Sequence, residues 1–179
     1  MVNTSEFQDE YSEEQARAAD FQKLEGGLVS DTVTLLAPSE PITLREDTTV
    51  YDAIVQMAEK RRAAVVIVDA GGRLIGVFTE RDLLRRVAVP GRDPRQTRLG
   101  DVMTREPETL APDDLIAYAI NRLHHASFRT IPLVDAEGKP LGVMTVNDIV
   151  HWIADLFPEA IVNLRPGGRL KRPQETDAG

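Results

Sequence analysis

Apolar residues along this chain follow two kinds of spacing, which predict short strands and amphipathic helices. The runs AAVVIVD at 63–69 and TIPLVD at 130–135 are too short for helices and rich in β-branched residues, so they predict buried strands. LIGVFT at 74–79 and PLGVMT at 140–145 predict two further strands. Helical spacing precedes each pair of strands and follows it again. The positions expected to face a core are Val50, Ala53, Ile54, Met57, Leu83, Leu84 and Val87, and then Ile116, Ala119, Ile120, Leu123, Ile149, Val150 and Ile153.

These elements form one unit that occurs twice. Shifting the sequence by 66 residues aligns Thr43–Asp82 with Thr109–Asp148 without gaps, and thirteen of the forty positions are then identical. Each copy begins with a short extended piece, Ile42–Leu44 or Glu108–Leu110, and the glycines of DAGGR and DAEGK predict the turns between its strands. The sequence therefore predicts an α/β protein of the α+β type, a tandem pair of β-α-β-β-α domains packed on each other.

The segments outside the repeats carry weaker patterns. Residues 12–24 predict a helix with a weak apolar stripe formed by Ala16, Ala19, Phe21 and Leu24. The linker AVPGRDPRQTRLGDVMT contains two prolines and two glycines, which predicts irregular structure up to Val102-Met103. We expect an acidic, partly helical extension (1–27), two repeat domains (28–90 and 91–157) and a polar C-terminal tail (158–179) that is disordered or lies on a partner.

The stretch GVFTERD at 76–82 recurs as GVMTVND at 142–148, so a threonine and an aspartate three residues apart follow a strand in both copies. This spacing is close to that of a helix capping box. The same pair could also bind a ligand, because a carboxylate can accept hydrogen bonds from two ribose hydroxyls and a helix N-terminus suits a phosphate. Gly76 and Gly142 would admit a ligand ring, or else close strand packing. Capping and ligand binding do not exclude each other.

Composition and charge narrow the classes of function. The chain has 21 basic and 29 acidic side chains, a net charge of −8 at pH 7 and no cysteine. Disulfides and thiolate metal sites are therefore excluded, and the cytoplasm is the predicted location. No apolar run approaches the roughly 18 residues of a membrane span, and the acidic N-terminus does not resemble a signal peptide. An acidic surface repels nucleic acid unless basic residues are segregated. The arginines that cluster are Arg81, Arg85, Arg86, Arg92, Arg95 and Arg98.

The doubled β-α-β-β-α unit, with its glycine turn and Gly-h-h-Thr-x-x-Asp motif, resembles the cystathionine-β-synthase (CBS) domain pair, or Bateman module. DVMT at 101–104 is similar to the entry segment of such domains, and VSDTVTLLAPSEPITL at 29–44 is similar to the same segment with an insertion. The ending FPEAIVNL and the piece DFQKLEGGLVSD resemble stand-alone bacterial members. The resemblance implies pseudo-twofold symmetry, sheets packed together with helices outside, two clefts between the halves, and a homodimer formed through the CBS helices.

The resemblance also implies a regulatory, ligand-sensing role. Its ligands would be adenosine-containing nucleotides such as AMP, ADP or ATP, ranked above S-adenosylmethionine, NAD and cyclic dinucleotides. It assigns ribose contacts to Asp82 and Asp148 and places Thr79 and Thr145 near the phosphates. The candidate nucleotide-binding residues are Thr79, Arg81, Asp82, Ala64 and Met103, and then Arg129, Thr130, Thr145, Asn147 and Asp148.

The two candidate clefts are not equal in sequence. Arg129-Thr130 precedes the buried strand of the second copy, where the first copy has Ala63-Ala64. If Arg129 faces the cleft instead of solvent, the cleft around Asp148 is the better phosphate binder. We therefore expect the second cleft to be the principal site.

Other side chains suggest no enzyme. His124 and His125 are adjacent on a predicted helix, where they point about 100° apart and cannot chelate one metal well. All three histidines lie in predicted helices, and no catalytic triad or carboxylate pair is evident. We expect no metal, no required cofactor and no catalysis. A nucleotide sensor is the leading hypothesis, a ligand-free dimerisation or adaptor protein the second, and a nucleic-acid-associated regulator using the clustered arginines the third.

Overall fold

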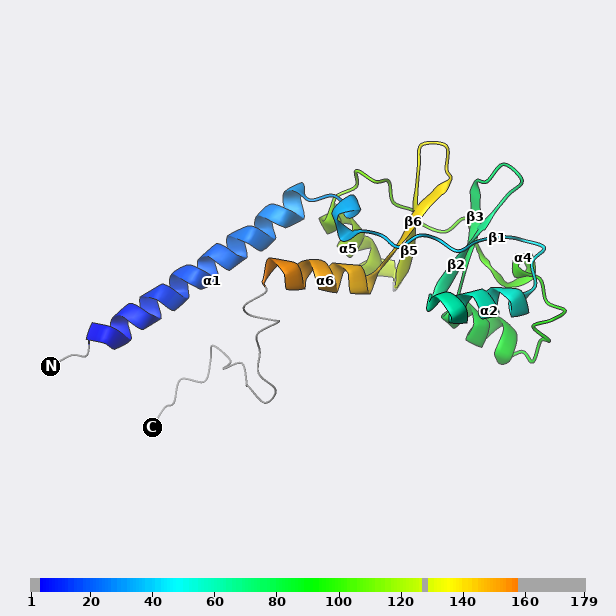
Figure 1. The fold of residues 1–179 in the computed structure, drawn as a ribbon, viewed down its shortest axis with the longest axis horizontal. Helices are drawn as coiled ribbons and strands as arrows, with labels where there is room; N and C mark the ends of the chain where they lie inside the picture. The colour runs from blue at the N-terminus through cyan, green and yellow to red at the C-terminus, as the bar shows by residue number, and fades with distance from the viewer. Residues whose placement is uncertain (1–3, 127–128, 158–179) are drawn as a thin grey trace.

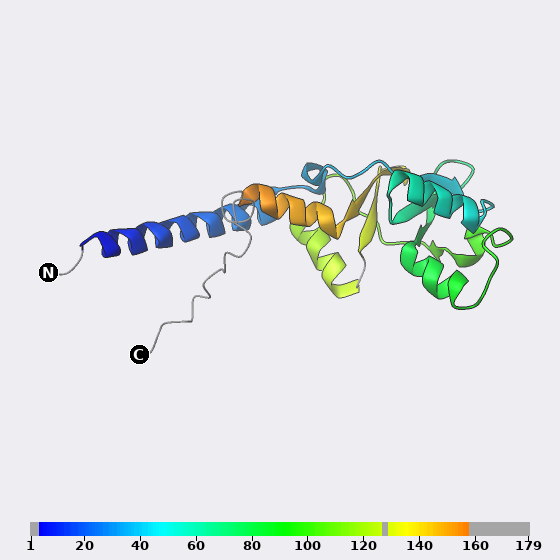
Figure 2. The same cartoon turned by 60° about the horizontal axis from the view of Figure 1, so that its bottom comes forward.

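The computed structural model describes residues 4–126 and 129–157. The strands of the two repeats lie in the middle of the molecule and the helices around them, as Figure 1 shows. A long helix extends away from this body in both Figure 1 and Figure 2. The predicted α/β architecture of two tandem units is thus confirmed.

The first repeat has the predicted order of elements. They are β1 (Thr43–Arg45), α2 (Val50–Lys60), β2 (Ala64–Val68), β3 (Leu74–Thr79), the single turn α3 (Glu80–Asp82) and η2 (Leu83–Ala88). Helix α2 begins where the Thr49 hydroxyl accepts a hydrogen bond from the N–H of Asp52 at 3.1 Å, and it ends at Arg61, whose φ of 53° is left-handed. Segment η2 is π-helical, a rare form that often occurs at functional sites.

The second repeat consists of α5 (Ile116–Ala126), β5 (Thr130–Val134), β6 (Pro140–Thr145) and α6 (Val146–Leu156). The extended piece predicted at 108–110 contributes only Leu110, which forms an isolated parallel bridge to Leu133. Arg122 of α5 donates from Nε to Glu108 at 2.8 Å, and this hydrogen bond raises the pKa of the Arg122 guanidinium. The segment before β5 is thereby fixed to α5.

The two repeats exchange the segments that enter them. Strand β4 (Thr104–Arg105), which precedes the second repeat in the chain, pairs antiparallel with β3 and completes the sheet order β1-β2-β3-β4. Ser39, which precedes the first repeat, bridges to Val143 next to the β5-β6 sheet. The domain boundaries at 28–90 and 91–157 therefore stay a prediction. They divide the sequence into repeats, whereas each entry segment packs against the opposite repeat.

Each repeat has its own hydrophobic core, and each core includes an exchanged segment. Helix α4 (Leu99–Val102) begins three residues earlier than the linker pattern predicted and buries Leu99 and Val102 in the core of the first repeat. The 3-10 turn η1 (Val33–Leu36) buries its ends in the core of the second. The exchange means that neither repeat completes its core from its own continuous sequence.

Two of the positions predicted to face a core do not. Leu84 is 62% exposed and Val150 is 54% exposed, whereas Val87 and Ile149 are buried. Adjacent residues on a helix point about 100° apart, so Leu83-Leu84 and Ile149-Val150 cannot both face the same core. Trp152, which was not among the predicted core positions, occupies the buried face of α6.

The N-terminal helix α1 (Thr4–Ser30) is longer than the 12–24 helix that the pattern predicted. Its last turns dock on the second repeat, where Leu24 and Leu28 pack against the core and Gly27 faces the ring of Trp152. The predicted stripe is wrong at Ala19 and Phe21, which are exposed, Phe21 by 74%. The reason is that these positions come before the turns of α1 that dock on the second repeat, at Leu24 to Leu28.

Candidate functional site

The recurring Thr-x-x-Asp motifs form capping boxes at the start of α3 and α6. The N–H of Thr79 donates to Asp82 Oδ2 at 3.0 Å, and the Thr79 hydroxyl donates to the same oxygen at 2.8 Å. In the second repeat the corresponding distances from Thr145 to Asp148 Oδ2 are 2.6 and 2.9 Å. The capping interpretation is confirmed in both repeats, and in both it uses only one oxygen of the carboxylate.

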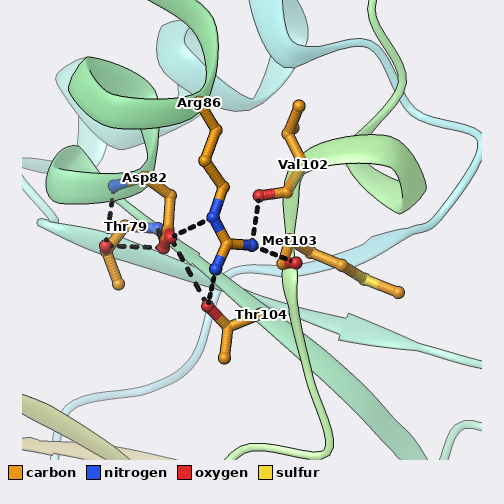
Figure 3. A network of polar contacts seen from close by, with 6 residues as sticks. All are labelled: Thr79, Asp82, Arg86, Val102, Met103 and Thr104. Atoms are coloured by element: carbon orange, nitrogen blue, oxygen red, sulfur yellow. Dashed lines mark hydrogen bonds and ion pairs between the residues drawn. The ribbon is translucent and has the colours of Figure 1, made fainter.

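In the first repeat the other carboxylate oxygen is also occupied. Asp82 Oδ1 lies 3.3 Å from Arg86 Nε and accepts a hydrogen bond from the Thr104 hydroxyl at 3.4 Å. Figure 3 shows these groups converging on the carboxylate from η2 and from the exchanged strand β4. An ionised carboxylate has about four lone-pair positions, and Asp82 already uses both of its oxygens in three hydrogen bonds and an ion pair.

In the second repeat the other carboxylate oxygen, Asp148 Oδ1, forms no hydrogen bond or ion pair with any residue within 4–126 and 129–157. Trp152 replaces Arg86 four positions after the aspartate, and its indole N–H donates to Asp31 Oδ2 at 3.1 Å instead. Half-buried Asp148 therefore keeps about two acceptor positions for an incoming donor.

Ser39 is the counterpart of Thr104 in the second repeat. Thr104 pairs with Val77, and Ser39 bridges to Val143, which lies 66 residues later at the equivalent position of the second repeat. The Ser39 hydroxyl donates to the Val143 carbonyl at 3.3 Å. Both of the donors that fill Asp82 Oδ1 thus have counterparts that point elsewhere.

Strand packing accounts for the two motif glycines. A Cβ on Gly76 would lie 2.4 Å from Met103 Sδ and 3.1 Å from the Thr104 carbonyl oxygen. A Cβ on Gly142 would lie 3.0 Å from the Cβ of Pro38. Of the two explanations left open for these glycines, close approach of the exchanged segments is the one the structure supports.

The remaining predicted site residues fall into exposed and buried groups. Arg81, Asn147 and Arg129 are exposed, and Thr130 is half-buried opposite Thr145 in the β5-β6 pair. The Arg129 carbonyl accepts a hydrogen bond from the N–H of Val146, so Arg129 lies at the same end of the repeat as the motif. Ala64 and Met103 are buried in the first repeat, where they offer a ligand little surface.

The clustered arginines are partly used inside the protein. Arg86 is bound to Asp82, Arg95 stacks on the ring of Tyr51 at 3.8 Å, and Arg98 reaches the Asp47 carbonyl at 3.5 Å. Because these three cations have intramolecular partners, the cluster is not a continuous free patch for nucleic acid. The adjacent His124 and His125 lie exposed on α5 with their rings edge to face, as expected for surface positions.

Beside the first motif, at the Ala63-Ala64 position where the first candidate cleft was expected, the structure has a hollow of about 420 Å³. Its lining is mostly apolar and includes Arg61 and Arg62, which precede Ala63-Ala64. The residues around it are Ile54, Met57, Ala58, Arg61, Arg62, Ala63, Glu80 and Leu83. It lies next to α2 and does not include Asp82.

The sequence analysis did not predict two features of the site, the pairing of Arg86 with Asp82 and the contact of Thr104 with Asp82. The first could have been found, because shifting the sequence by 66 residues places Trp152 opposite Arg86. The contact of Thr104 with Asp82 was not visible, because Thr104 lies outside the gap-free alignment and approaches only through the exchange of entry segments.

None of the helices that the structure describes is long and apolar enough to cross a membrane. Among the same residues, no group of three or more histidine, aspartate or glutamate side chains is arranged to hold a metal ion.

Comparison with known proteins bears on the whole tandem unit. A family model described as CBS domain matches the chain twice, at residues 33–89 and 99–155. The chain is 33% identical over 122 residues to "CBS domain-containing protein CBSX3, mitochondrial" of Arabidopsis thaliana, which covers 66% of this chain and 59% of that protein. It is 32% identical over 120 residues to CBSCBSPB2 of the same plant, which covers 67% of this chain and 22% of that protein. The chain therefore spans less than two thirds of either relative.

A solved structure, CBSX2 in complex with AMP, is 25% identical and superposes with a TM-score of 0.61 over 70% of this chain and 97% of that chain. The fold, the doubled motif and the two matches of the family model agree. This chain belongs to the CBS-domain family and consists largely of a tandem pair of CBS domains.

Proposed function

We propose that this CBS pair is a regulatory module that binds an adenosine-containing nucleotide, with AMP, ADP and ATP as the first candidates. The free oxygen of Asp148 carries the proposal, because a half-buried carboxylate with two open acceptor positions matches the 2′- and 3′-hydroxyls of a ribose. The complex of the similar protein CBSX2 with AMP supports the class of ligand.

The surroundings of Asp148 fit the rest of a nucleotide. Thr130 and Thr145 are opposite each other at the end of the β5-β6 pair, and the exposed Arg129 precedes them. A guanidinium there can bind phosphate oxygens by charge-assisted hydrogen bonds, and the N-terminus of α6 adds a favourable dipole. Arg129 therefore favours ligands with phosphate groups over those with none.

Titration calorimetry with AMP, ADP and ATP tests the proposal. Each charge-assisted hydrogen bond contributes about 1.5–3 kcal/mol, so Asp148→Ala is expected to weaken binding by roughly a hundredfold or more. Asp82→Ala, the matched change in the first repeat, should alter the affinity far less, since both oxygens of Asp82 already have partners within the protein. Absence of binding below about 1 mM for all three nucleotides would end the proposal.

A ligand-free adaptor is the second candidate, and the two capping boxes favour it, because capping alone explains why Thr-x-x-Asp occurs twice. This candidate predicts that Asp148→Ala costs about 1 kcal/mol of unfolding free energy and that no nucleotide raises the melting temperature. Asp148→Asn separates the two, because the amide oxygen can still accept a hydrogen bond from the Thr145 N–H at the helix start but carries no charge. A sensor should lose affinity in this variant, and an adaptor should lose nothing.

The proposed module acts in the cytoplasm as a homodimer formed through the CBS helices. The exposed apolar residues Leu84 and Val150 lie on those helices and support this assembly. Analytical ultracentrifugation with and without AMP tests it, and a purely monomeric protein at micromolar concentration would contradict it.

A further inference from the structure

The motif aspartates of the two repeats differ in what already occupies them. We propose that Arg86 closes the first cleft to nucleotides, so that each chain binds a single nucleotide, at the second repeat. This inference rests on the proposed function above and concerns the number of sites and the residue that sets it.

Arg86 holds Asp82 from a fixed position. Its Nη1 donates to the carbonyl of Val102 at 3.0 Å and also to the carbonyl of Met103, while Nη2 donates to the Thr104 hydroxyl at 3.2 Å. Its Nε faces Asp82 Oδ1 at 3.3 Å, as Figure 3 shows. A single exposed ion pair competes weakly with a ligand, but a guanidinium anchored by three further acceptors has to be displaced as a whole.

Asp82 is more enclosed than an ordinary surface acid. Its side chain is 13% exposed, and its oxygens accept two hydrogen bonds from Thr79 and one from Thr104 besides the ion pair with Arg86. A ribose entering this cleft would need to replace the Arg86 and Thr104 contacts with its own hydroxyls. The exchange removes a charge-assisted contact and restores at most an equivalent one, so it yields little binding energy.

Position 152 of the second repeat, which corresponds to Arg86, carries no cation that could pair with Asp148. Trp152 cannot pair with a carboxylate as a cation does, and its N–H is committed to Asp31. The helices also differ, since Arg86 lies on the π-helical η2 and Trp152 on the regular helix α6. The same motif is therefore closed in one repeat and open in the other.

Calorimetric titration of the full chain with AMP tests the inference through the number of sites. The wild type is expected to bind one AMP per chain. Arg86→Met keeps the aliphatic stem and removes the cation, and it should bind two, the new site within about tenfold of the affinity of the first. Arg85→Met, a neighbouring exposed arginine, is the control and should still bind one.

Adding Asp148→Ala separates this inference from the proposed function. In the wild-type background it should remove all binding, and in the Arg86→Met background it should leave one site, at Asp82. If the wild type binds one AMP through Asp148 and Arg86→Met adds none, the inference is wrong and the proposed function stands. If the wild type binds nothing but Arg86→Met binds one, the Asp148 site is wrong and the role of Arg86 stands; no binding by either rejects both.

The number of AMP molecules bound by the wild type and the behaviour of a second variant, Arg86→Gln, also test the inference. Two AMP molecules bound to the wild type would overturn the inference without any variant. If circular dichroism shows that Arg86→Met is unfolded, Arg86→Gln is used, because it keeps a polar end for the Val102 carbonyl while removing the charge. It is expected to bind two AMP per chain, and a folded Arg86→Gln protein that binds only one contradicts the inference.

Discussion

The first and second repeats have the same motif but different residues four positions beyond its aspartate. Arg86 of the first repeat lies near the surface and clamps the carboxylate, whereas Trp152 of the second is buried and turns its polar group toward Asp31. One repeat has thus used its aspartate entirely for internal structure, and the other has kept half of it available. The difference teaches that a motif reports a capping geometry, while its neighbours decide whether a ligand can use it.

The largest change in unfolding free energy is expected from substitutions at positions 86 and 152, which are equivalent in the two repeats but differ in burial. Trp152→Ala removes a large ring from the second core and from its contact with Gly27, and should lower the unfolding free energy by about 3–5 kcal/mol. Arg86→Ala, at the equivalent position, should cost less, about 1.5–3 kcal/mol, because it removes a charge-assisted contact to the enclosed Asp82 but leaves no large apolar cavity. Urea unfolding measures both.

The control for this prediction is Trp152→Phe, which keeps most of the ring and loses the N–H donor, and should cost roughly 1 kcal/mol beyond the small volume change. Equal losses at positions 86 and 152 would show that the two positions do not differ in the way described.

The next effect tests how closely the exchanged segments approach the motif glycines. Gly76→Ala should lower the unfolding free energy by about 1–3 kcal/mol, because the backbone oxygen of Thr104 cannot move away easily. Gly142→Ala meets mainly Pro38 and should cost less, partly offset by the lower entropy of its unfolded chain. Urea unfolding of the pair checks the order, and a larger loss at Gly142 would reverse the comparison.

Capping should be the feature that the repeats share. Thr79→Ala and Thr145→Ala are each expected to cost about 0.5–2 kcal/mol, since each removes a hydroxyl from a capping box. Thermal and urea unfolding provide the measurement. Threonine-to-serine changes keep the hydroxyl and should be nearly neutral, and an alanine variant without effect in one repeat would show that its box is dispensable.

The smallest effect concerns phosphate binding at the second cleft. Arg129→Gln should weaken ATP binding by roughly 1.4- to fivefold, the range of an exposed charge pair of about 0.2–1 kcal/mol, and the loss should shrink at high salt. Lys139→Gln serves as the control. It removes another cation of the second repeat, in the turn before β6 and at the opposite end of that strand from Thr145. An unchanged ATP affinity in Arg129→Gln would place that arginine outside the site.

Much of the fold followed from local patterns. The strands β3 and β6 begin and end where their runs predicted, and Gly72 and Gly138 take the left-handed φ values of 81° and 80° that their turns require. Such features depend on residues close in sequence, so the sequence is sufficient for them. The pattern failed at Phe21, on a part of α1 that does not reach a core, and at Leu84, which points away from the core that Leu83 contacts.

The sequence by itself determined that there are two β-α-β-β-α units, that each contains a cap at Thr-x-x-Asp, and that the second has Arg129 beside it. Only the tertiary structure decided which aspartate is free. The segment 102–104 crosses to the first repeat and positions the acceptors that hold Arg86 against Asp82, whereas the segment at Pro38-Ser39 brings no such clamp to Asp148. Whether the second oxygen of the motif aspartate has a partner depends on contacts between residues distant in the chain. The periodicity of a single helix or strand carries no information about such contacts.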